Sequence, residues 1–265
     1  MTSELGLRTS DFSRRIFVFN MKLALAGYGK MGHEIESVAK SRRHEIVGIY
    51  DIDKPLSLED LKAKSPDAII DFTQPDTVVA NVKIYAGAKI PTVIGTTGWD
   101  AEVPKVKKMI EDAGIGCVIG SNYSIGVNLF LKIVASASKL IDAADYDIFI
   151  TEAHHRMKKD FPSGTALRIS EAVLSGSTSK TKAISELQQG EAISAESILI
   201  SSIRAGAITG THTVGFDSEE DTIELTHRAK SRRGFALGAV RAAEWIAGKK
   251  GFYRFEEHIS EILGG

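Results

Sequence analysis

Short apolar runs alternate with amphipathic stretches through the first half of the chain. The apolar runs are typical of buried strands and lie at residues 22–26, 45–50, 67–71, 91–94 and 116–119. The stretches between them have helical spacing, at 31–39, 77–86 and 104–113. Strands that alternate with helices predict a doubly wound, Rossmann-like parallel sheet, which is an α/β fold with right-handed crossovers.

The pattern changes after Asn122. Long helices are predicted at 127–139 and 165–174, and strands at 147–152, 197–204, 211–216 and 222–227. We expect these to form a separate α+β domain with an open mixed sheet, whose exposed face suits oligomerisation. An alanine-rich helix at 235–247 could pack back onto the first domain.

Composition places the chain among ordinary globular proteins and limits its partners. Its 265 residues are 43% hydrophobic and 25% charged, with a net charge of -1. No global field therefore favours nucleic acid or an anionic membrane. No apolar run has the length of a membrane span, and the only cysteine, Cys117, excludes an intrachain disulfide. We expect a cytoplasmic protein.

A glycine motif follows the first strand and opens the first helix. It reads Gly27-Tyr28-Gly29-Lys30-Met31-Gly32, the G-x-G-x-x-G pattern in which glycines allow a tight turn and a close approach to a pyrophosphate. Asp51 ends the next strand, about 20 residues on, where a carboxylate can bind the adenine ribose. The context predicts a dinucleotide site. Asp51 disfavours a 2′-phosphate and Lys54 could compensate, so NADH is favoured with some use of NADPH.

A second glycine loop, Gly95-Thr96-Thr97-Gly98, follows the strand at 91–94. The carboxyl ends of strands line the ligand crevice of open parallel sheets, although a plain connecting loop is the alternative. We therefore assign residues 21–122 and 230–265 to a dinucleotide-binding domain, and 123–229 to a substrate-binding and oligomerisation domain. Residues 1–20 form an N-terminal extension.

Titratable groups concentrate in the run from Glu152 to Ala166, where a strand leads into a helix. The helix start at Ser163, Gly164 and Thr165 can hold a carboxylate through its N–H groups, and Lys158 can add positive charge. His155 could meet a second carboxylate while His154 moves a proton. Neighbouring residues of an extended chain point to opposite sides, so one histidine could instead be structural. The remaining histidines are scattered, and no metal site is predicted.

The run His154-His155-Arg156-Met157-Lys158-Lys159-Asp160-Phe161-Pro162-Ser163-Gly164-Thr165 resembles the signature of the dihydrodipicolinate reductases, now called 4-hydroxy-tetrahydrodipicolinate reductases. The resemblance covers essentially the whole chain from Met21. It includes the loop at residues 95–98 and the blocks at 121–128, 204–206, 210–213 and 225–229. Two departures are a glycine turn one residue shorter than in many relatives, and Phe161 in place of a small residue.

The resemblance implies a function and a role for each residue. The enzyme would reduce a small cyclic dicarboxylate with NADH or NADPH, in the diaminopimelate route to lysine, as a homotetramer. His154 would carry the proton and Lys158 would be a second acid. The implied substrate ligands are His155, Ser163, Gly164, Thr165 and Thr97. The implied cofactor contacts beyond the glycine motif and Asp51 are Gly95, Thr96, Thr97, Ser121, Asn122, Tyr123 and Arg232.

Two other functions remain possible from the residues. A dehydrogenase of another small acid, such as aspartate, would explain the glycine motif and Asp51 but not the run from His154 to Thr165. A non-catalytic dinucleotide sensor would need the cofactor site but no proton donor. The joint presence of His154, Lys158 and Thr165 argues against the sensor.

Overall fold

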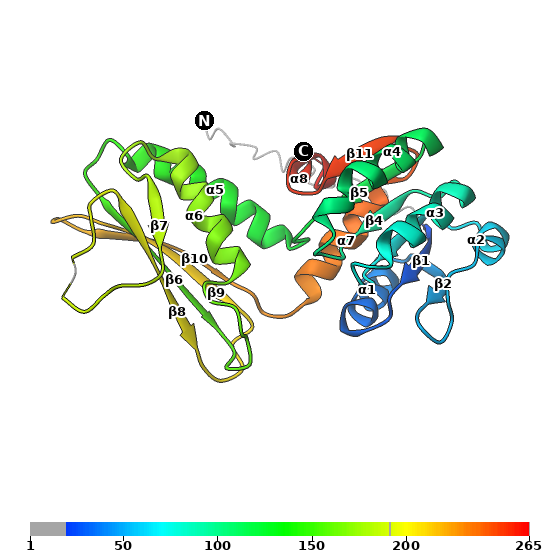
Figure 1. Ribbon diagram of the computed structural model, residues 1–265, viewed down its shortest axis with the longest axis horizontal. Helices are drawn as coiled ribbons and strands as arrows, with labels where there is room; N and C mark the ends of the chain where they lie inside the picture. The colour runs from blue at the N-terminus through cyan, green and yellow to red at the C-terminus, as the bar shows by residue number, and fades with distance from the viewer. Residues whose placement is uncertain (1–19, 191, 265) are drawn as a thin grey trace, which may run out of the picture.

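The computed structural model describes residues 20–190 and 192–264. The predicted N-terminal extension therefore lies outside the described residues, apart from Asn20. The described chain forms two lobes, each with its own β-sheet (Figure 1).

The first sheet is parallel throughout, as predicted. Its strand order is β11-β5-β4-β3-β1-β2. The strands are β1 (Lys22–Ala26), β2 (Glu45–Tyr50), β3 (Ala68–Asp71), β4 (Thr92–Ile94), β5 (Gly116–Ile119) and β11 (Gly251–Arg254). The carboxyl ends of these strands meet at one edge, where ligands of such sheets bind.

Helices cover both faces of this sheet. One face packs against α1 (Lys30–Ser41), α7 (Arg233–Ile246) and α8 (Ile259–Ile262), and the other against α2 (Leu58–Lys64), α3 (Val78–Ala88) and α4 (Val103–Ala113). Side chains alternate along a strand, so Leu23 and Leu25 enter the first core while Ala24 and Ala26 enter the second. The chain leaves after β5 and returns as α7, which packs on α1 and on β3, β4 and β5.

The second sheet is mixed, with the order β10-β9-β6-β8-β7. Its strands are β6 (Asp147–His154), β7 (Lys182–Ile184), β8 (Ser197–Arg204), β9 (Thr211–Asp217) and β10 (Thr222–Arg228). β6 runs parallel to β8 and antiparallel to β9. Helices α5 (Ile125–Ile141) and α6 (Gly164–Gly176) cover one face through a core that includes Phe130, Ile169 and Phe216. No helix of the described residues covers the other face (Figure 1).

Sequence patterns missed the short elements α2, β7, β11 and α8, together with a 3₁₀ turn at Asp100–Glu102. They carry little periodic signal: α2 has one buried residue, Leu61, and β7 is three residues long at a sheet edge. Across residues 20–190 and 192–264, no helix combines the length and apolar character needed to cross a bilayer.

Glu244 of α7 ties the returning chain to the first lobe. Its carboxylate accepts hydrogen bonds from Arg42 Nε at 2.6 Å and Nη2 at 2.8 Å, and lies 2.7 Å from His44 Nε2. His44 Nδ1 accepts from the Met21 N–H, so Nε2 carries the proton given to Glu244. Burial alone would raise the pKa of Glu244, but the bonds from His44 and Arg42 outweigh it and lower that pKa.

We expect Glu244→Gln to lower the free energy of unfolding by about 2 kcal/mol at pH 7, because it leaves the Arg42 guanidinium without its counter-charge and weakens the hydrogen bond from His44. Urea denaturation followed by circular dichroism measures this. Asp112→Asn is the control, because it breaks only the exposed pair with Lys108 and should cost under about 0.5 kcal/mol. Equal losses for the two variants would contradict the assigned role of Glu244.

Candidate active site

The glycine turn between β1 and α1 is closely packed. Gly27 has φ +83°, and a Cβ there would lie 2.2 Å from the Phe72 carbonyl oxygen. A Cβ on Gly32 would lie 2.5 Å from the Gly27 carbonyl oxygen. Strand, turn and helix therefore have the close geometry that the motif predicts for a dinucleotide site.

The start of α1 is open to a ligand. Gly29 is the N-cap residue, no side chain caps the first turn, and no atom lies within 4 Å of a Cβ built on Gly29. In contrast, Ser124 caps α5 and Ser163 caps α6. The uncapped N–H groups of α1, in the turn that contains Lys30 and Met31, suit the pyrophosphate of a dinucleotide.

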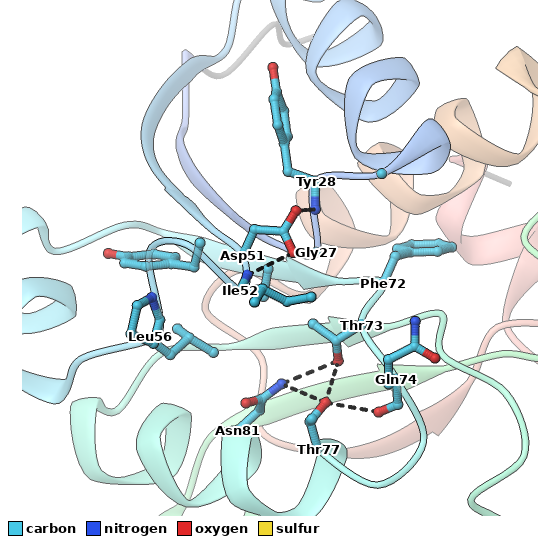
Figure 2. Close-up of a pocket in the computed structure, with 14 residues that line it drawn as sticks. Gly27, Tyr28, Asp51, Ile52, Leu56, Phe72, Thr73, Gln74, Thr77 and Asn81 are labelled. Atoms are coloured by element: carbon cyan, nitrogen blue, oxygen red, sulfur yellow. Dashed lines mark hydrogen bonds between the residues drawn. The ribbon is translucent and has the colours of Figure 1, made fainter.

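A groove runs along the carboxyl ends of the strands. Two pockets, of about 370 and 430 Å³, share Gly29, Phe72, Thr73 and Gln74, and a third of about 70 Å³ adjoins them through Thr96 and Thr97. Figure 2 shows the first of these pockets. Further lining residues include Gly27, Tyr28, Asp51, Lys30, Met31, Gly32, Gly95 and Ser121. The groove thus joins most of the predicted cofactor residues in one continuous surface.

Asp51 sits at the wall of this groove beside the glycine turn (Figure 2). Its carboxylate accepts hydrogen bonds from the N–H groups of Tyr28 at 3.2 Å and Ile52 at 2.9 Å. The main-chain N–H groups of Lys54 and Asp51 each donate a hydrogen bond to the other residue's carbonyl oxygen. The Lys54 ammonium lies 5.9 Å from the centre of the Tyr50 ring. The carboxylate therefore faces the place where a ribose would lie, and Lys54 is directed onto Tyr50.

A buried carboxylate that sequence reasoning missed holds the groove loops together. Asp71 is fully buried and accepts hydrogen bonds from Thr73 Oγ1 at 2.6 Å, Tyr85 Oη at 2.8 Å, Asn81 Nδ2 at 3.1 Å and Thr96 Oγ1 at 3.4 Å. These donors belong to the segments after β3 and β4. Asp71 therefore fixes Thr96 and Thr73 beside the groove.

In the second lobe, Glu152 and His154 lie on the same face of β6. They are 1% and 8% exposed, because the face points toward the helices. Arg204 donates to the Glu152 carboxylate at 2.7 and 2.9 Å, the Ser163 N–H donates at 3.2 Å, and His154 Nδ1 contacts it as well. Burial would raise the pKa of Glu152, but hydrogen bonds led by those from Arg204 lower it to about 2.

Because Nδ1 of His154 contacts Glu152, Nε2 is the ring nitrogen left to contact a substrate. A Cβ on Gly210, where φ is +153°, would lie 3.0 Å from Nε2, so a side chain there would crowd the ring. Burial lowers the pKa of His154, against the opposing effect of the bond to Glu152. Near neutral pH the ring is therefore mainly uncharged and can exchange a proton at Nε2.

The start of α6 forms the other part of this cluster. Ser163 Oγ accepts from the Ala166 N–H at 3.2 Å, so the N–H groups of Gly164 and Thr165 are left for a ligand. Lys158 lies in the loop between β6 and α6, where its ammonium pairs with Asp160 at 2.9 Å. The cluster combines a proton carrier, a cation and a helix start, which suits a carboxylate substrate.

Several predicted residues lie apart from these groups. Tyr123 is 2% exposed and its hydroxyl donates to main-chain oxygens of Ile94 and Val118, so its side chain belongs to the core. The Asn122 side chain accepts from the Ser124 N–H, and Arg232 is the N-cap residue of α7. His155 follows the end of β6 and is less buried than His154. The groove is lined by the first lobe, whereas His154 lies in the second.

Sequence reasoning treated His212 and His227 as scattered, but the structure brings both beside the cluster. The ring of His212 meets that of His154 edge-on at 5.1 Å, and His227 follows at 6.4 Å. Glu152 and Arg204 were also not assigned roles. The spacing of Glu152 two residues before His154 carried a usable signal, because such residues share a strand face. Within the described residues no group of histidine, cysteine and carboxylate side chains is placed to hold a metal.

The fold and the site define a two-lobed, NAD(P)H-dependent oxidoreductase. The family profile "Dihydrodipicolinate reductase, N-terminus" matches residues 21–123, and "Dihydrodipicolinate reductase, C-terminus" matches residues 126–259. The chain belongs to the dihydrodipicolinate reductase family.

Individual relatives agree with this assignment. The chain is 37% identical over 246 residues to the 4-hydroxy-tetrahydrodipicolinate reductase of Christiangramia forsetii, covering 92% of this chain and 99% of the relative. It is 43% identical to that of Methanosarcina mazei over 199 residues, covering 74% of each chain. The fold is similar to dipicolinate-bound dihydrodipicolinate reductase from Paenisporosarcina sp. TG-14, with TM-score 0.72, 24% identity, and coverage of 90% of this chain and 99% of that one.

We expect Glu152→Gln to lower the free energy of unfolding by about 3 kcal/mol at pH 7, because Arg204 loses its buried counter-charge. The folded pKa of about 2 lies below the ordinary value, so the carboxylate stabilises the fold above about pH 4 and loses this effect as pH falls toward 2. Denaturation at pH 7 and pH 3 should therefore show a smaller deficit at pH 3.

The matched control is Glu224→Gln, the same change at an exposed position of β10, which should cost under about 0.5 kcal/mol. A deficit for Glu152→Gln that does not shrink in acid would mean that packing, and not charge, gives Glu152 its effect.

Proposed function

We propose that the chain reduces 4-hydroxy-tetrahydrodipicolinate, or dihydrodipicolinate, to tetrahydrodipicolinate with NADH or NADPH, in the diaminopimelate pathway of lysine biosynthesis. The family and the named relatives support the reaction. The observation that carries the proposal is the buried cluster in which Glu152 contacts both His154 and the N–H of Ser163. It places a proton carrier next to a helix start that suits a carboxylate.

The residues divide the work between binding and proton transfer. The N–H groups of Gly164 and Thr165 hold one substrate carboxylate, with the start of α6 adding its dipole. Lys158 and His155 add hydrogen bonds and positive charge, and Thr97 borders the substrate from the first lobe. Because these donors are held in place before the reaction, they stabilise the charge that develops on the substrate during reduction.

The dinucleotide, when bound in the groove, supplies the hydride to the conjugated imine. In its protonated form, reached when Nε2 takes up a proton from solvent, His154 delivers that proton from Nε2 to the neighbouring carbon, and Glu152 accepts the hydrogen bond from Nδ1 and holds the ring in place. Lys158 serves as the second acid. The 4-hydroxy form also loses water, so that substrate, reductant and one proton yield tetrahydrodipicolinate, water and the oxidised dinucleotide. Approach of the two lobes over the substrate would exclude solvent during transfer.

We propose NADH as the favoured cofactor. Asp51 faces the groove with a carboxylate that would repel a 2′-phosphate, and Lys54, which could offset this charge, lies over the Tyr50 ring. The uncapped start of α1 supports either dinucleotide equally. We also propose that the cofactor is contacted, through main-chain or side-chain atoms, by Ser121, Asn122, Tyr123 and Arg232.

We also propose a domain division, an oligomeric state and a cellular location. Residues 21–122 and 230–265 form the dinucleotide-binding domain, and 123–229 form the substrate-binding and oligomerisation domain. A homotetramer is supported by the face of the second sheet that α5 and α6 leave open, where Ile203 is 53% exposed. A cytoplasmic location is supported by the single, buried thiol of Cys117.

Oxidation of NADH and NADPH at 340 nm tests the reaction, with the condensation product of pyruvate and aspartate semialdehyde as substrate and dipicolinate as inhibitor. We expect rapid oxidation that dipicolinate blocks. His154→Gln should lower kcat by about a hundredfold with little change in the Kd of NADH, whereas Lys158→Ala should impair both kcat and substrate KM.

Unchanged turnover in a folded His154→Gln protein would remove that residue from the mechanism. Tight binding of NADH by the wild type without oxidation would favour a dehydrogenase of another acid, or a dinucleotide sensor.

Cofactor preference tests the role of Asp51. Asp51→Ala should lower the ratio of kcat/KM for NADH to that for NADPH by about tenfold, because charged hydrogen bonds to the ribose are lost and repulsion of the 2′-phosphate is relieved. Asp53→Asn is the control in the same turn, since Asp53 does not line the groove pockets, and its ratio should stay within about twofold of wild type. An unchanged ratio in Asp51→Ala would reject Asp51 as the determinant.

A further inference from the structure

His212 lies between His154, the proposed proton carrier, and the start of α6, the proposed carboxylate site. It has no assigned role in either. It is 4% exposed on β9, directly opposite Glu152 on β6 and opposite His227 on β10. A buried imidazole is costly unless it is used for packing or hydrogen bonding. Its contacts therefore indicate what its position is for.

One contact is to the start of α6. His212 Nε2 lies 3.3 Å from Ser163 Oγ, the same oxygen that accepts from the Ala166 N–H and caps the helix. A rotation of the Ser163 side chain would break this cap and release the first turn of α6. His212 therefore restrains the residue that sets the direction of the Gly164 and Thr165 N–H groups.

The other contact is to the proton carrier. The rings of His212 and His154 meet edge-on, with centroids 5.1 Å apart and planes at 72°. Glu152 holds His154 at Nδ1. His212 contacts the His154 ring as well, so that the ring is restrained at both its anchored nitrogen and its edge.

We propose, on the basis of the reductase function above, that His212 is a positioning residue that holds the helix start binding the substrate carboxylate in register with the His154 imidazole. It does this through the hydrogen bond to Ser163 and the ring contact to His154. It transfers no proton itself.

The hydrogen bond also has a definite direction. His212 Nδ1 has no hydrogen-bond partner in the described part of the chain. A buried N–H without a partner is rarer than an unpaired acceptor, so the proton belongs on Nε2 and is donated to Ser163 Oγ. Burial also lowers the pKa of His212, to about 4, which keeps the ring uncharged at neutral pH.

A pair of substitutions separates this bond from simple packing. His212→Leu fills similar space without a donor, whereas the amide of His212→Gln can occupy the place of Nε2. In His212→Leu we expect the Kd of dipicolinate, measured with NADH present, to rise about tenfold and kcat to fall about tenfold, with the Kd of NADH unchanged. His212→Gln should recover both values to within about threefold of wild type.

His227→Gln is the matched control. It is the same substitution on the same sheet face, one strand further on, and His227 has no contact with Ser163 or His154 among the hydrogen bonds and ring pairs of the described residues. Its kcat and dipicolinate Kd should remain within about twofold of wild type. Wild-type values in a folded His212→Leu protein, or a His212→Gln protein as impaired as His212→Leu, would overturn the proposal.

A measurement on the unaltered protein covers the case in which His212→Leu fails to fold. Nitrogen-15 spectra of labelled histidine should show His212 neutral, with its proton on Nε2, from about pH 6 to 8. A proton on Nδ1 would overturn the assigned hydrogen bond.

The outcomes also separate the two proposals. Turnover by wild type with no effect of His212→Leu rejects the role of His212 and leaves the reductase function intact. Dipicolinate binding that depends on His212, without reduction of the substrate, rejects the reaction and leaves the positioning role intact. Absence of dipicolinate binding in the wild type rejects both.

Discussion

The buried carboxylate of Glu152 is the constraint on which the second lobe depends. A charge with no exposed surface is stable only if donors surround it, and here the donors come from three separate elements: Arg204 at the end of β8, His154 at the end of β6 and the Ser163 N–H before α6. Satisfying one charge therefore fixes the ends of two strands and the start of a helix together. The chemistry proposed for this protein needs those three places to be fixed.

The first lobe solves a similar problem with uncharged donors. Asp71 is as buried as Glu152, yet its partners are the hydroxyls of Thr73, Tyr85 and Thr96 and the amide of Asn81. Among residues 20–190 and 192–264, no cationic side chain donates a hydrogen bond to Asp71. The arrangement places threonine hydroxyls and backbone groups beside apolar side chains such as Leu56 and Phe72 in the groove. In each lobe one buried carboxylate therefore fixes the loops beside a helix start to which the proposed function assigns an anionic ligand.

The sequence predicted the architecture well because both sheets have a strong periodic signal. Strands such as Glu45–Tyr50 and Ser197–Arg204 have the bounds read from the pattern. Sequence patterns did not predict the contacts that join segments far apart in the chain. Arg204 lies 52 residues from Glu152, and His212 lies 49 residues from Ser163, so no spacing rule relates them. Strand pairing in register places His212 opposite Glu152, and that register depends on the whole sheet.

The near-neutral net charge explains why helix starts are prominent in this site. Dinucleotide and dicarboxylate are both anions, and a chain of net charge -1 offers no general attraction to them. The strongest cation of the second cluster, Arg204, is already committed to Glu152, and Lys158 is paired with Asp160. Backbone N–H groups carry no countercharge that must be satisfied elsewhere. The proposal therefore assigns anion binding to the uncapped turn of α1 and to the first N–H groups of α6, held by Ser163, because the side-chain cations are already used.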